Sequence, residues 1–424
     1  MRWGDACFVF VLIAVMLAGS GAKGLAQGAN GQETPAPGSP LLLVSLDGFR
    51  WDYCDLHPEE TPNLRRLRRE GVSARGLVPV FPSNTFPNHY SLVTGLYPVE
   101  HGMINNQFFD EQHQLFFRYN QPGAAGESRW WGGEPIWVTA IQHGRKAGVS
   151  FWVGSEAEIK GVRPTFYRKF DSKLSFEVRL EEVISWLQKP AGQRPDFLAF
   201  YLEETNDTGH RFGPGSPELV ASIKLLDARL GTLLTRIAQE GLSPNVIIVS
   251  DHGMESVDLK RVSALEDYFD PSEVQIESHG SVVGLRPLKG DVSSVLAKAA
   301  RIPHAQAYRV TELPAHFRMQ EHPRVSPIWI IPDVGAHVST RATIATYQTR
   351  HPAQGYLPGD HGYDPAHVTM HGIFIAHGPA FQRGISIPEV ENVHVYNLLC
   401  RVLGILPAPN SGDERLVNAA LRAP

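Results

Sequence analysis

Three short, mostly apolar runs recur along the chain, and each leads directly into acidic residues or histidine. The runs are Leu41–Leu46, Phe197–Leu202 and Val246–Val249. None of them alternates regularly between apolar and polar positions, and such continuous runs are typical of strands that are buried on both faces. We therefore predict three buried strands, each of which ends at a group of polar side chains.

Segments with helical periodicity separate these runs. They are Thr61–Glu70, Glu177–Gln188 and Pro217–Glu240. Strands that alternate with helices predict a mainly parallel sheet in a three-layer α/β fold. In open sheets of this kind, ligands bind beyond the carboxyl ends of the strands. We therefore expect the polar residues that follow the three runs to lie together at one edge of the sheet.

Residues 255–350 have a different pattern. Apolar segments at Ser281–Leu285 and Ile328–Ile331 predict strands around a helix at Asp291–Ala300, in a stretch that contains many prolines. We expect an inserted, smaller α+β subdomain here that shapes the entrance to the site. The main fold is expected to resume near Gly359.

The composition is that of a globular protein, with 42% hydrophobic and 20% charged residues in 424. The formal net charge of −5 argues against a nucleic-acid-binding patch, which needs an excess of Lys and Arg. The chain has 3 cysteines and 18 histidines, which excludes a zinc site with four thiolates and makes His and Asp the expected metal ligands. We expect a monomer.

Residues 1–26 have the pattern of a secretory signal peptide. Arg2 precedes the apolar block Phe8–Ala18, and small residues follow it. The block is too short to span a bilayer comfortably, although Asp5 weakens the positive start and leaves an uncleaved anchor as the alternative. Residues 27–39 are rich in Gly, Pro and polar residues and predict a flexible leader. We therefore expect an exported protein, periplasmic or secreted, with no membrane span beyond the signal segment.

Export would place Cys54 and Cys400 in an oxidising compartment. The two residues could form a disulfide or remain as buried free thiols. The distance between them decides between these alternatives, and it depends on the fold.

Candidate chemistry begins at the end of the first run. Asp47 follows this strand directly. Within residues 81–95, Pro87 suits a first helical turn and Gly95 ends the helix. Thr85 therefore lies at or just before a helix N-terminus, where free N–H groups and the helix dipole favour a phosphate. A hydroxyl there is a candidate nucleophile, because the dipole and a metal ion would stabilise its alkoxide.

Further acidic residues and histidines lie at other strand ends. They are Asp251 and His252 after the third run, Glu203–His210 after the second, and Asp360-His361 where the main fold resumes. A lone aspartate or histidine at such a position is ordinary, but the repetition points to a site. Carboxylates mixed with imidazoles suit Zn²⁺ or a similar divalent ion. Two such ions about 4 Å apart would hold the attacking and leaving oxygens of a phosphoryl transfer.

These residues lie in five specific segments. The segments read DGFRWDY, FPSNTFPNHYSLVTGLYPVEHGMINNQFFD, YLEETNDTGHRFGP, SDHGM and DHGYDPAHVTMHGIFIAHGPAF. They closely resemble the nucleotide pyrophosphatase/phosphodiesterase family of the alkaline phosphatase superfamily, in that family's order and spacing. The tail VYNLLCRVLGILPAPNSG is similar to the end of the family's catalytic domain. The resemblance implies that residues 40–424 form one catalytic domain with an alkaline-phosphatase-like, three-layer core.

The resemblance also implies a role for each matching position. Thr85 matches the nucleophile that forms a covalent nucleotidyl-enzyme. Two Zn²⁺ ions per chain are the implied cofactors. The matching ligands are Asp47, Thr85, Asp251 and His252 for one zinc, and His210 and His361 for the second.

Other matching positions face the substrate. Asn106 matches a side chain that donates to a non-bridging phosphate oxygen, which would stabilise charge in the transition state. Phe86 and Phe170 match aromatic residues that face the nucleotide base, and Tyr201 lies near the same pocket. A small nucleotide is therefore the implied binding partner.

One position departs from the family's pattern, Tyr-x-Glu-Glu-x-Asp-x-x-Gly-His. Asn206 stands where the pattern has its metal-binding Asp, and Asp207 is next to it. An Asn carbonyl can bind a hard cation but carries no charge, so we expect a weaker second zinc site. Either Asn206 or a shifted Asp207 could provide the ligand.

Three functions follow from these observations. The first is an exported hydrolase in which Thr85 attacks the α-phosphorus of a nucleotide or dinucleotide, and water then frees a nucleoside 5′-monophosphate. The second keeps the fold but hydrolyses a phospholipid-type or other phosphodiester, because an aromatic box also suits a choline headgroup. The third is a zinc-poor pseudoenzyme that binds nucleotide without hydrolysis, and Asn206 is its only support.

Overall fold

An eight-stranded sheet forms the centre of the fold in the computed structural model, which describes residues 39–350 and 358–423. The expected signal peptide and residues 27–38 of the expected leader lie outside the described residues. Across the sheet, the strands are β19 (Ile385–Ile387), β2 (Val72–Ala74), β18 (Phe374–His377), β9 (Asn245–Val249), β1 (Leu41–Leu46), β8 (Phe197–Leu202), β6 (Ala147–Ser150) and β7 (Phe166–Arg168).

The five neighbouring strands from β9 to β7 run parallel, and β18 is antiparallel to both of its neighbours. The three predicted runs form β1, β8 and β9, with β1 at the centre, where Leu41 pairs with Phe197 on one side and Asn245 on the other. All residues of these three strands are buried. The prediction of a mainly parallel sheet is confirmed.

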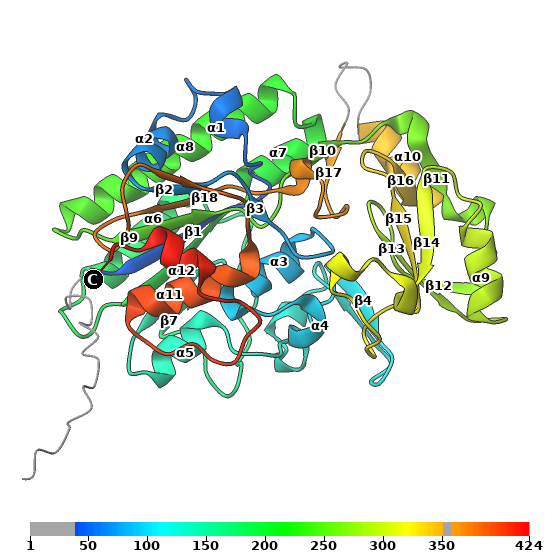
Figure 1. Ribbon diagram of the computed structural model, residues 1–424, viewed down its shortest axis with the longest axis horizontal. Helices are drawn as coiled ribbons and strands as arrows, with labels where there is room; N and C mark the ends of the chain where they lie inside the picture. Colours follow the sequence, from blue (N-terminus) through cyan, green and yellow to red (C-terminus); the bar gives the residue numbers. More distant parts are fainter. Residues whose placement is uncertain (1–38, 351–357, 424) are drawn as a thin grey trace, which may run out of the picture. The chain divides into compact units, whose positions relative to one another are not determined.

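Helices cover both faces of the sheet and complete three layers (Figure 1). Side chains alternate between the faces, so Leu42 and Val44 of β1 belong to one apolar cluster, and Leu41 and Leu43 to the other. The first cluster includes helices α1 (Tyr53–Leu56), α2 (Pro62–Glu70), α6 (Phe176–Leu187) and α8 (Pro217–Gln239). The second includes α3 (Thr85–Thr94), α5 (Ile136–Gln142), α11 (Val395–Leu403) and α12 (Arg415–Ala420).

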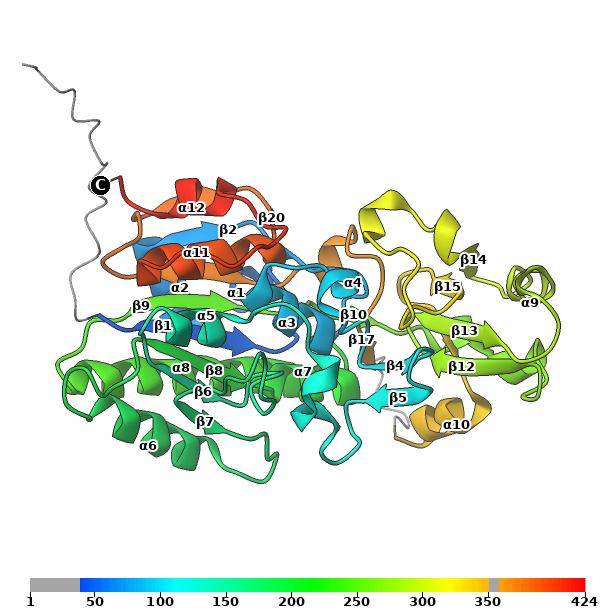
Figure 2. The ribbon, with the colours of Figure 1, turned by 90° about the horizontal axis from the view of Figure 1, so that it is seen from below.

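A second, antiparallel sheet lies within residues 255–350 (Figure 2). It packs against helix α9 (Val292–Ala299) and has an apolar cluster of its own. Its strands are β12 (Val274–Ser278), β13 (Val283–Pro287), β15 (Ile328–Pro332) and β14 (Ala305–Arg309). The proposed boundaries of this subdomain stay a prediction.

Short elements connect these parts. Strand pairs are β10 (Glu255–Ser256) with β17 (Gly359–Asp360), β11 (Val262–Ala264) with β16 (His337–Ser339), β4 (Gln107–Asp110) with β5 (Leu115–Arg118), and β3 (Leu77–Val78) with β20 (Val390–Glu391). The remaining helices are α4 (Pro98–His101), α7 (Glu204–Phe212) and α10 (Arg341–Arg350). Within the described ranges, none of the helices has the length and apolar character needed to cross a membrane.

Cys54 and Cys400 are both buried free thiols. Cys54 belongs to the apolar cluster on one face of the central sheet, and Cys400 belongs to the cluster on the opposite face. The sheet therefore separates the two sulfur atoms, which leaves the free-thiol alternative.

Candidate metal centre and active site

Thr85 is the first residue of helix α3. Its neighbour Asn84 is the extended N-cap residue, and the Asn84 side chain donates to Asn105 Oδ1 at 2.7 Å. Gly95 ends the helix with a left-handed conformation, φ 67°. Thr85 therefore occupies the helix N-terminus, as the sequence predicts, where the first N–H groups lack helical acceptors.

The first cluster of polar atoms lies at the carboxyl ends of β1 and β9. His252 Nε2 is 3.3 Å from Thr85 Oγ1, 3.4 Å from Asp47 Oδ1 and 3.1 Å from Asp251 Oδ2. Asp47, Asp251 and His252 are fully buried. Asp47 Oδ1 has no hydrogen-bond partner among the described residues, and Asp251 Oδ2 faces ring nitrogens of His252 and His89, each at 3.1 Å. Four side chains from three segments that are remote in sequence therefore converge on one point.

The second cluster contains His210, from α7, and His361, which follows β17. Their Nε2 atoms are 3.1 Å apart. The His361 ring also stacks on the ring of His252, with centroids 3.5 Å apart, so the two clusters adjoin. Asn206 lies one helical turn before His210, and its Oδ1 is buried without a hydrogen-bond partner in the described part of the chain. Asp207 is exposed.

The nitrogen atoms of the three histidines are arranged as in metal sites. The Nδ1 atoms of His210, His252 and His361 lie within 3.0 Å of backbone carbonyl oxygens, to which each can donate a proton. Each neutral ring then keeps a lone pair on Nε2, and the lone pairs of His210 and His361 face each other. A cation between them would remove that repulsion, so the donor set fits a divalent metal such as Zn²⁺.

Burial and neighbouring charges shift the pKa values of the residues in the two polar clusters. Burial and the charge of Asp251 raise the pKa of Asp47 well above its ordinary value. Burial also opposes ionisation of Asp251, but His252 and His89 outweigh it and hold the pKa of Asp251 well below its ordinary value. Burial, with His252 and His210 nearby, lowers the pKa of His361, which favours the neutral imidazole that binds metals.

Asn106 is oriented by the backbone of α3. Its Oδ1 accepts a hydrogen bond of 2.9 Å from the N–H of Phe86, so its amide nitrogen is the atom left to donate to a ligand. The Phe86 ring packs 5.6 Å from Phe117 and 6.0 Å from Tyr119. Phe86 and Asn106 therefore lie together next to Thr85.

Phe170 and Tyr201 form a different aromatic group, with ring centroids 6.3 Å apart. Phe170 is 51% exposed, whereas Tyr201 is buried. The Tyr201 hydroxyl donates to Asp47 Oδ2 at 2.5 Å. Tyr201 thus connects an exposed aromatic ring to a residue of the first cluster.

Two residues close to these clusters were missed from the sequence, and a third, Asp360, was named there without a role of its own. His89 lies one turn after Thr85 in α3, and its Nδ1 is 3.1 Å from Asp251 Oδ2. Its place in the segment of residues 81–95 was the available signal. Asp360 is one of the polar residues expected near the site, and its Oδ2 is 2.7 Å from Nε2 of His337. His337 is a lone histidine in a strand of the inserted region, and nothing in the sequence pattern points to it.

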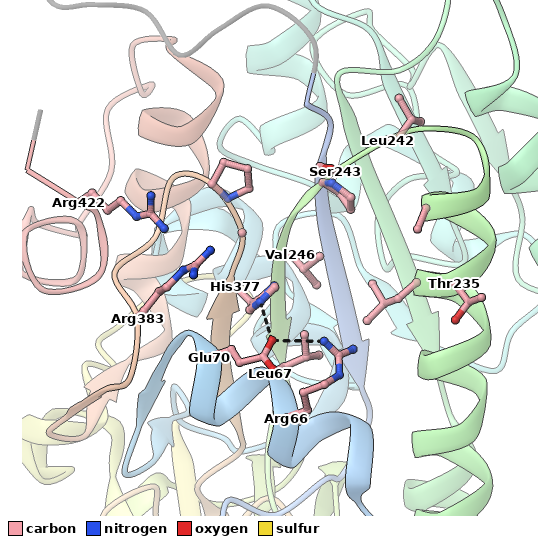
Figure 3. A pocket seen from close by; sticks show the side chains of 15 residues that line it. Arg66, Leu67, Glu70, Thr235, Leu242, Ser243, Val246, His377, Arg383 and Arg422 are labelled. Carbon is pink, nitrogen blue, oxygen red and sulfur yellow. Dashed lines mark hydrogen bonds and ion pairs between the residues drawn. The ribbon is translucent and has the colours of Figure 1, made fainter.

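A cavity of about 590 Å³ lies elsewhere, between α2, the end of α8 and the strands β9 and β18. Figure 3 shows Glu70 between Arg66 and His377, with Arg383 and Arg422 across from them. Val246, near the start of β9, lines this cavity, whereas Asp251 follows the end of the same strand. The cavity therefore opens at the opposite edge of the sheet from the two clusters.

Comparisons with known proteins agree with this architecture. The venom phosphodiesterase of Macrovipera lebetinus is 35% identical over 399 residues, which cover 91% of this chain and 46% of that protein. Ectonucleotide pyrophosphatase/phosphodiesterase family member 1 of Homo sapiens is 34% identical over 409 residues, which cover 93% of this chain and 42% of that protein. This chain thus spans less than half of the length of these relatives.

Solved structures show the same fold. Human ectonucleotide pyrophosphatase/phosphodiesterase 5 superposes with a TM-score of 0.83 at 31% identity, over 90% of this chain and 100% of that chain. An inactive threonine-to-alanine variant of the murine protein, in complex with AMP, has a TM-score of 0.82 at 32% identity, with the same coverage of both chains. Residues 41–364 match the family described as type I phosphodiesterase/nucleotide pyrophosphatase, and the chain belongs to that family.

Proposed function

We propose that this protein is a metal-dependent phosphodiesterase and pyrophosphatase that hydrolyses nucleotides or dinucleotides to nucleoside 5′-monophosphates through a covalent intermediate on Thr85. One observation carries the proposal. The Thr85 hydroxyl lies at the start of α3 and 3.3 Å from His252 Nε2, which also faces the buried carboxylate oxygens of Asp47 and Asp251. A hydroxyl beside such a group of potential metal ligands is a candidate for activation as a nucleophile.

The proposed metal ligands follow the two clusters. They are Asp47, Thr85, Asp251 and His252 for one Zn²⁺, and Asn206, His210 and His361 for the other. When bound, the cations would supply positive charge that lowers the pKa of the attacking hydroxyl and offsets charge on the phosphoryl group. The unpartnered, buried Oδ1 of Asn206 supports Asn206 rather than the exposed Asp207 as the ligand.

The proposed reaction has two displacements at phosphorus. In the first, the bond between Thr85 Oγ1 and phosphorus forms while the leaving group departs with the electron pair of its bond to phosphorus, and the hydroxyl proton passes to solvent. In the second, a water oxygen attacks the phosphorus, and Thr85 leaves and regains a proton. The dipole of α3 and the Asn106 amide nitrogen would stabilise the phosphoryl oxygens during each displacement.

A nucleotide suits the surroundings of Thr85. Phe86 and the exposed Phe170 offer aromatic faces on which a base can stack without preference for its identity, and the buried ring of Tyr201 packs against Phe170. The AMP complex of the murine relative supports a nucleotide ligand, and the inactivity of its threonine-to-alanine variant supports a threonine in the reaction.

We further propose an exported, monomeric protein in which residues 40–424 form the catalytic domain, with residues 255–350 inserted. The similarity to venom phosphodiesterases supports export. So does the signal-like pattern of residues 1–26.

Hydrolysis of p-nitrophenyl-thymidine 5′-monophosphate by the purified protein tests the proposal. We expect turnover that EDTA abolishes and zinc restores, and a loss of about a thousandfold or more in Thr85→Ala. Thr85→Ser, which keeps a hydroxyl, should retain part of the activity. Equal turnover of the native protein and Thr85→Ala would contradict the proposal.

Two further measurements separate the alternatives. Faster hydrolysis of glycerophosphocholine than of the nucleotide ester would favour a lipid-type diesterase. Metal analysis of the purified protein tests for a pseudoenzyme, because two zinc ions per chain with turnover would exclude it.

A further inference from the structure

We infer that Asp360, held in place by His337, supplies the second metal site with the negative charge that Asn206 does not bring. The inference rests on the proposed function, since it concerns the zinc held by His210 and His361. It assigns a positioning and charge-compensating role to two residues that need not bind the metal themselves.

The starting point is the uncharged ligand. The family's pattern has an aspartate where this chain has Asn206, so the second site loses one full negative charge. A divalent cation held by two neutral imidazoles and one amide would keep its whole charge in a partly buried place, which is costly. A carboxylate close to the site, although not bound to the metal, would lower that cost.

Asp360 is such a carboxylate. Its Oδ1 accepts a hydrogen bond of 2.8 Å from the backbone N–H of His361 and lies 3.9 Å from His210 Nδ1. The Nδ1 of His210 faces away from the Nε2 pair, and it also lies 3.0 Å from the carbonyl oxygen of Gly359. Asp360 therefore stands behind the His210 ring, where its negative charge acts through space on a cation held by that ring.

His337 fixes this carboxylate from the other side. Its Nε2 is 2.7 Å from Asp360 Oδ2, and both side chains are largely buried. The backbone at Gly280 comes so close that a Cβ there would lie 3.0 Å from His337 Nε2 and 3.7 Å from Asp360 Oδ2. His337 lies on β16, within residues 255–350, so the inserted region takes part in building the second site.

The test is a titration of zinc against a competing chelator, followed in the native protein and in two single variants. Asp360→Asn keeps the size of the side chain but removes its charge. We expect it to lower the affinity for the more weakly bound zinc by about 10- to 100-fold. His337→Gln should lower the affinity for the same zinc, because it leaves the charge of Asp360 but no longer holds the Asp360 carboxylate in place. Asp333→Asn, an exposed aspartate of the same region that pairs with Arg261, is the matched control and should leave zinc affinity unchanged.

The decisive comparison uses Asn206→Asp as a second background. Restoring a charged ligand should raise the affinity of the second site for zinc. In that background, Asp360→Asn should reduce zinc affinity clearly less than it does in the protein with Asn206. An equal loss in both backgrounds, or no loss in either Asp360→Asn or His337→Gln, would overturn the inference. Unfolding of the metal-free proteins is measured in parallel. A variant that lowers zinc affinity only by destabilising the fold would show a matching drop in its unfolding midpoint. That result would also overturn the inference.

The outcome separates this inference from the proposed function. If the native protein binds two zinc ions and hydrolyses the nucleotide ester, but Asp360→Asn binds zinc as the native protein does, only the role of Asp360 fails. If the native protein binds no zinc at all, the proposed function fails, and the inference fails with it.

Discussion

The hydroxyl of Tyr201 donates a hydrogen bond of 2.5 Å to Asp47 Oδ2, which joins the end of β8 to the end of β1. The bond leaves only Oδ1 of Asp47 facing His252 and Thr85. Tyr201, expected from the sequence to lie near the base, therefore also orients a proposed metal ligand. The role of the Tyr201 hydroxyl can be tested separately from that of its ring, because phenylalanine keeps the ring and lacks the hydroxyl.

Tyr201→Phe should lower activity without removing the ring. A hydrogen bond to a charged group contributes about 1.5–3 kcal/mol, so we expect kcat/KM to fall by roughly tenfold or more at limiting zinc. The loss should shrink when zinc is in excess, because added metal refills a weakened site. Nucleotide-ester kinetics at two zinc concentrations measure both effects.

Tyr167→Phe is the control for this prediction, since Tyr167 is an exposed tyrosine in β7. If Tyr201→Phe behaves like Tyr167→Phe at limiting zinc, the hydrogen bond to Asp47 does not support the metal site.

A buried ion pair should make stability depend on pH. Asp110, in β4, is buried and pairs with Arg324 at 2.9 Å. Burial opposes its ionisation, but hydrogen bonds from Arg324 and His113 outweigh this and lower the pKa of Asp110. A carboxyl with a lowered pKa stabilises the fold above its unfolded pKa of about 3.9, and this contribution disappears as the pH falls through the folded value.

Asp110→Asn should therefore lower the free energy of unfolding by about 3 kcal/mol at pH 7, because it leaves Arg324 without its charged partner. The difference from the native protein should narrow below about pH 4. Urea unfolding at both pH values checks this. Glu158→Gln removes an exposed ion pair with Arg163 and should change stability by no more than about 0.5 kcal/mol. A penalty for Asp110→Asn that is the same at both pH values would show that charge is not its origin.

Cys54 and Cys400 should be unreactive in the folded protein. Burial raises the pKa of the Cys54 thiol to about 12 and that of Cys400 to about 12, so neither forms the reactive thiolate near neutral pH. Maleimide should label neither residue in the native protein and both residues after denaturation without reductant. Labelling that requires a reductant would reveal a disulfide and contradict the separation of the thiols by the sheet.

Much of the central sheet could be predicted because burial on both faces leaves a simple pattern. Leu41–Leu46 and Phe197–Leu202 form β1 and β8 with the predicted bounds, since continuous apolar runs have few other solutions. Asp47 and Asp251 lie together because adjacent parallel strands end at the same edge. The resemblance to a family added roles that no pattern of burial contains.

Other features depend on contacts that sequence patterns do not encode. His337 reaches Asp360 because β16 brings it beside the end of β17, and a lone histidine in a strand gives no sign of this. The hydroxyl of Tyr201 points to Asp47 through a side-chain orientation that is settled only by packing. His377 belongs to the same sequence segment as His361, but it lines the cavity at the opposite edge of the sheet. The reason is that β18 runs antiparallel to β9, so the last residue of β18 lies beside the start of β9.

The proposed reaction requires the Thr85 oxygen to attack phosphorus. Its most direct test is to mix the zinc-loaded protein with ATP radiolabelled in the α-phosphate, quench with acid during turnover, and map the labelled peptide. We predict label on the peptide that contains Thr85, label on the same peptide in Thr85→Ser, and none in Thr85→Ala. Turnover of the native protein with no labelled peptide, or with the label on another residue, would contradict the account.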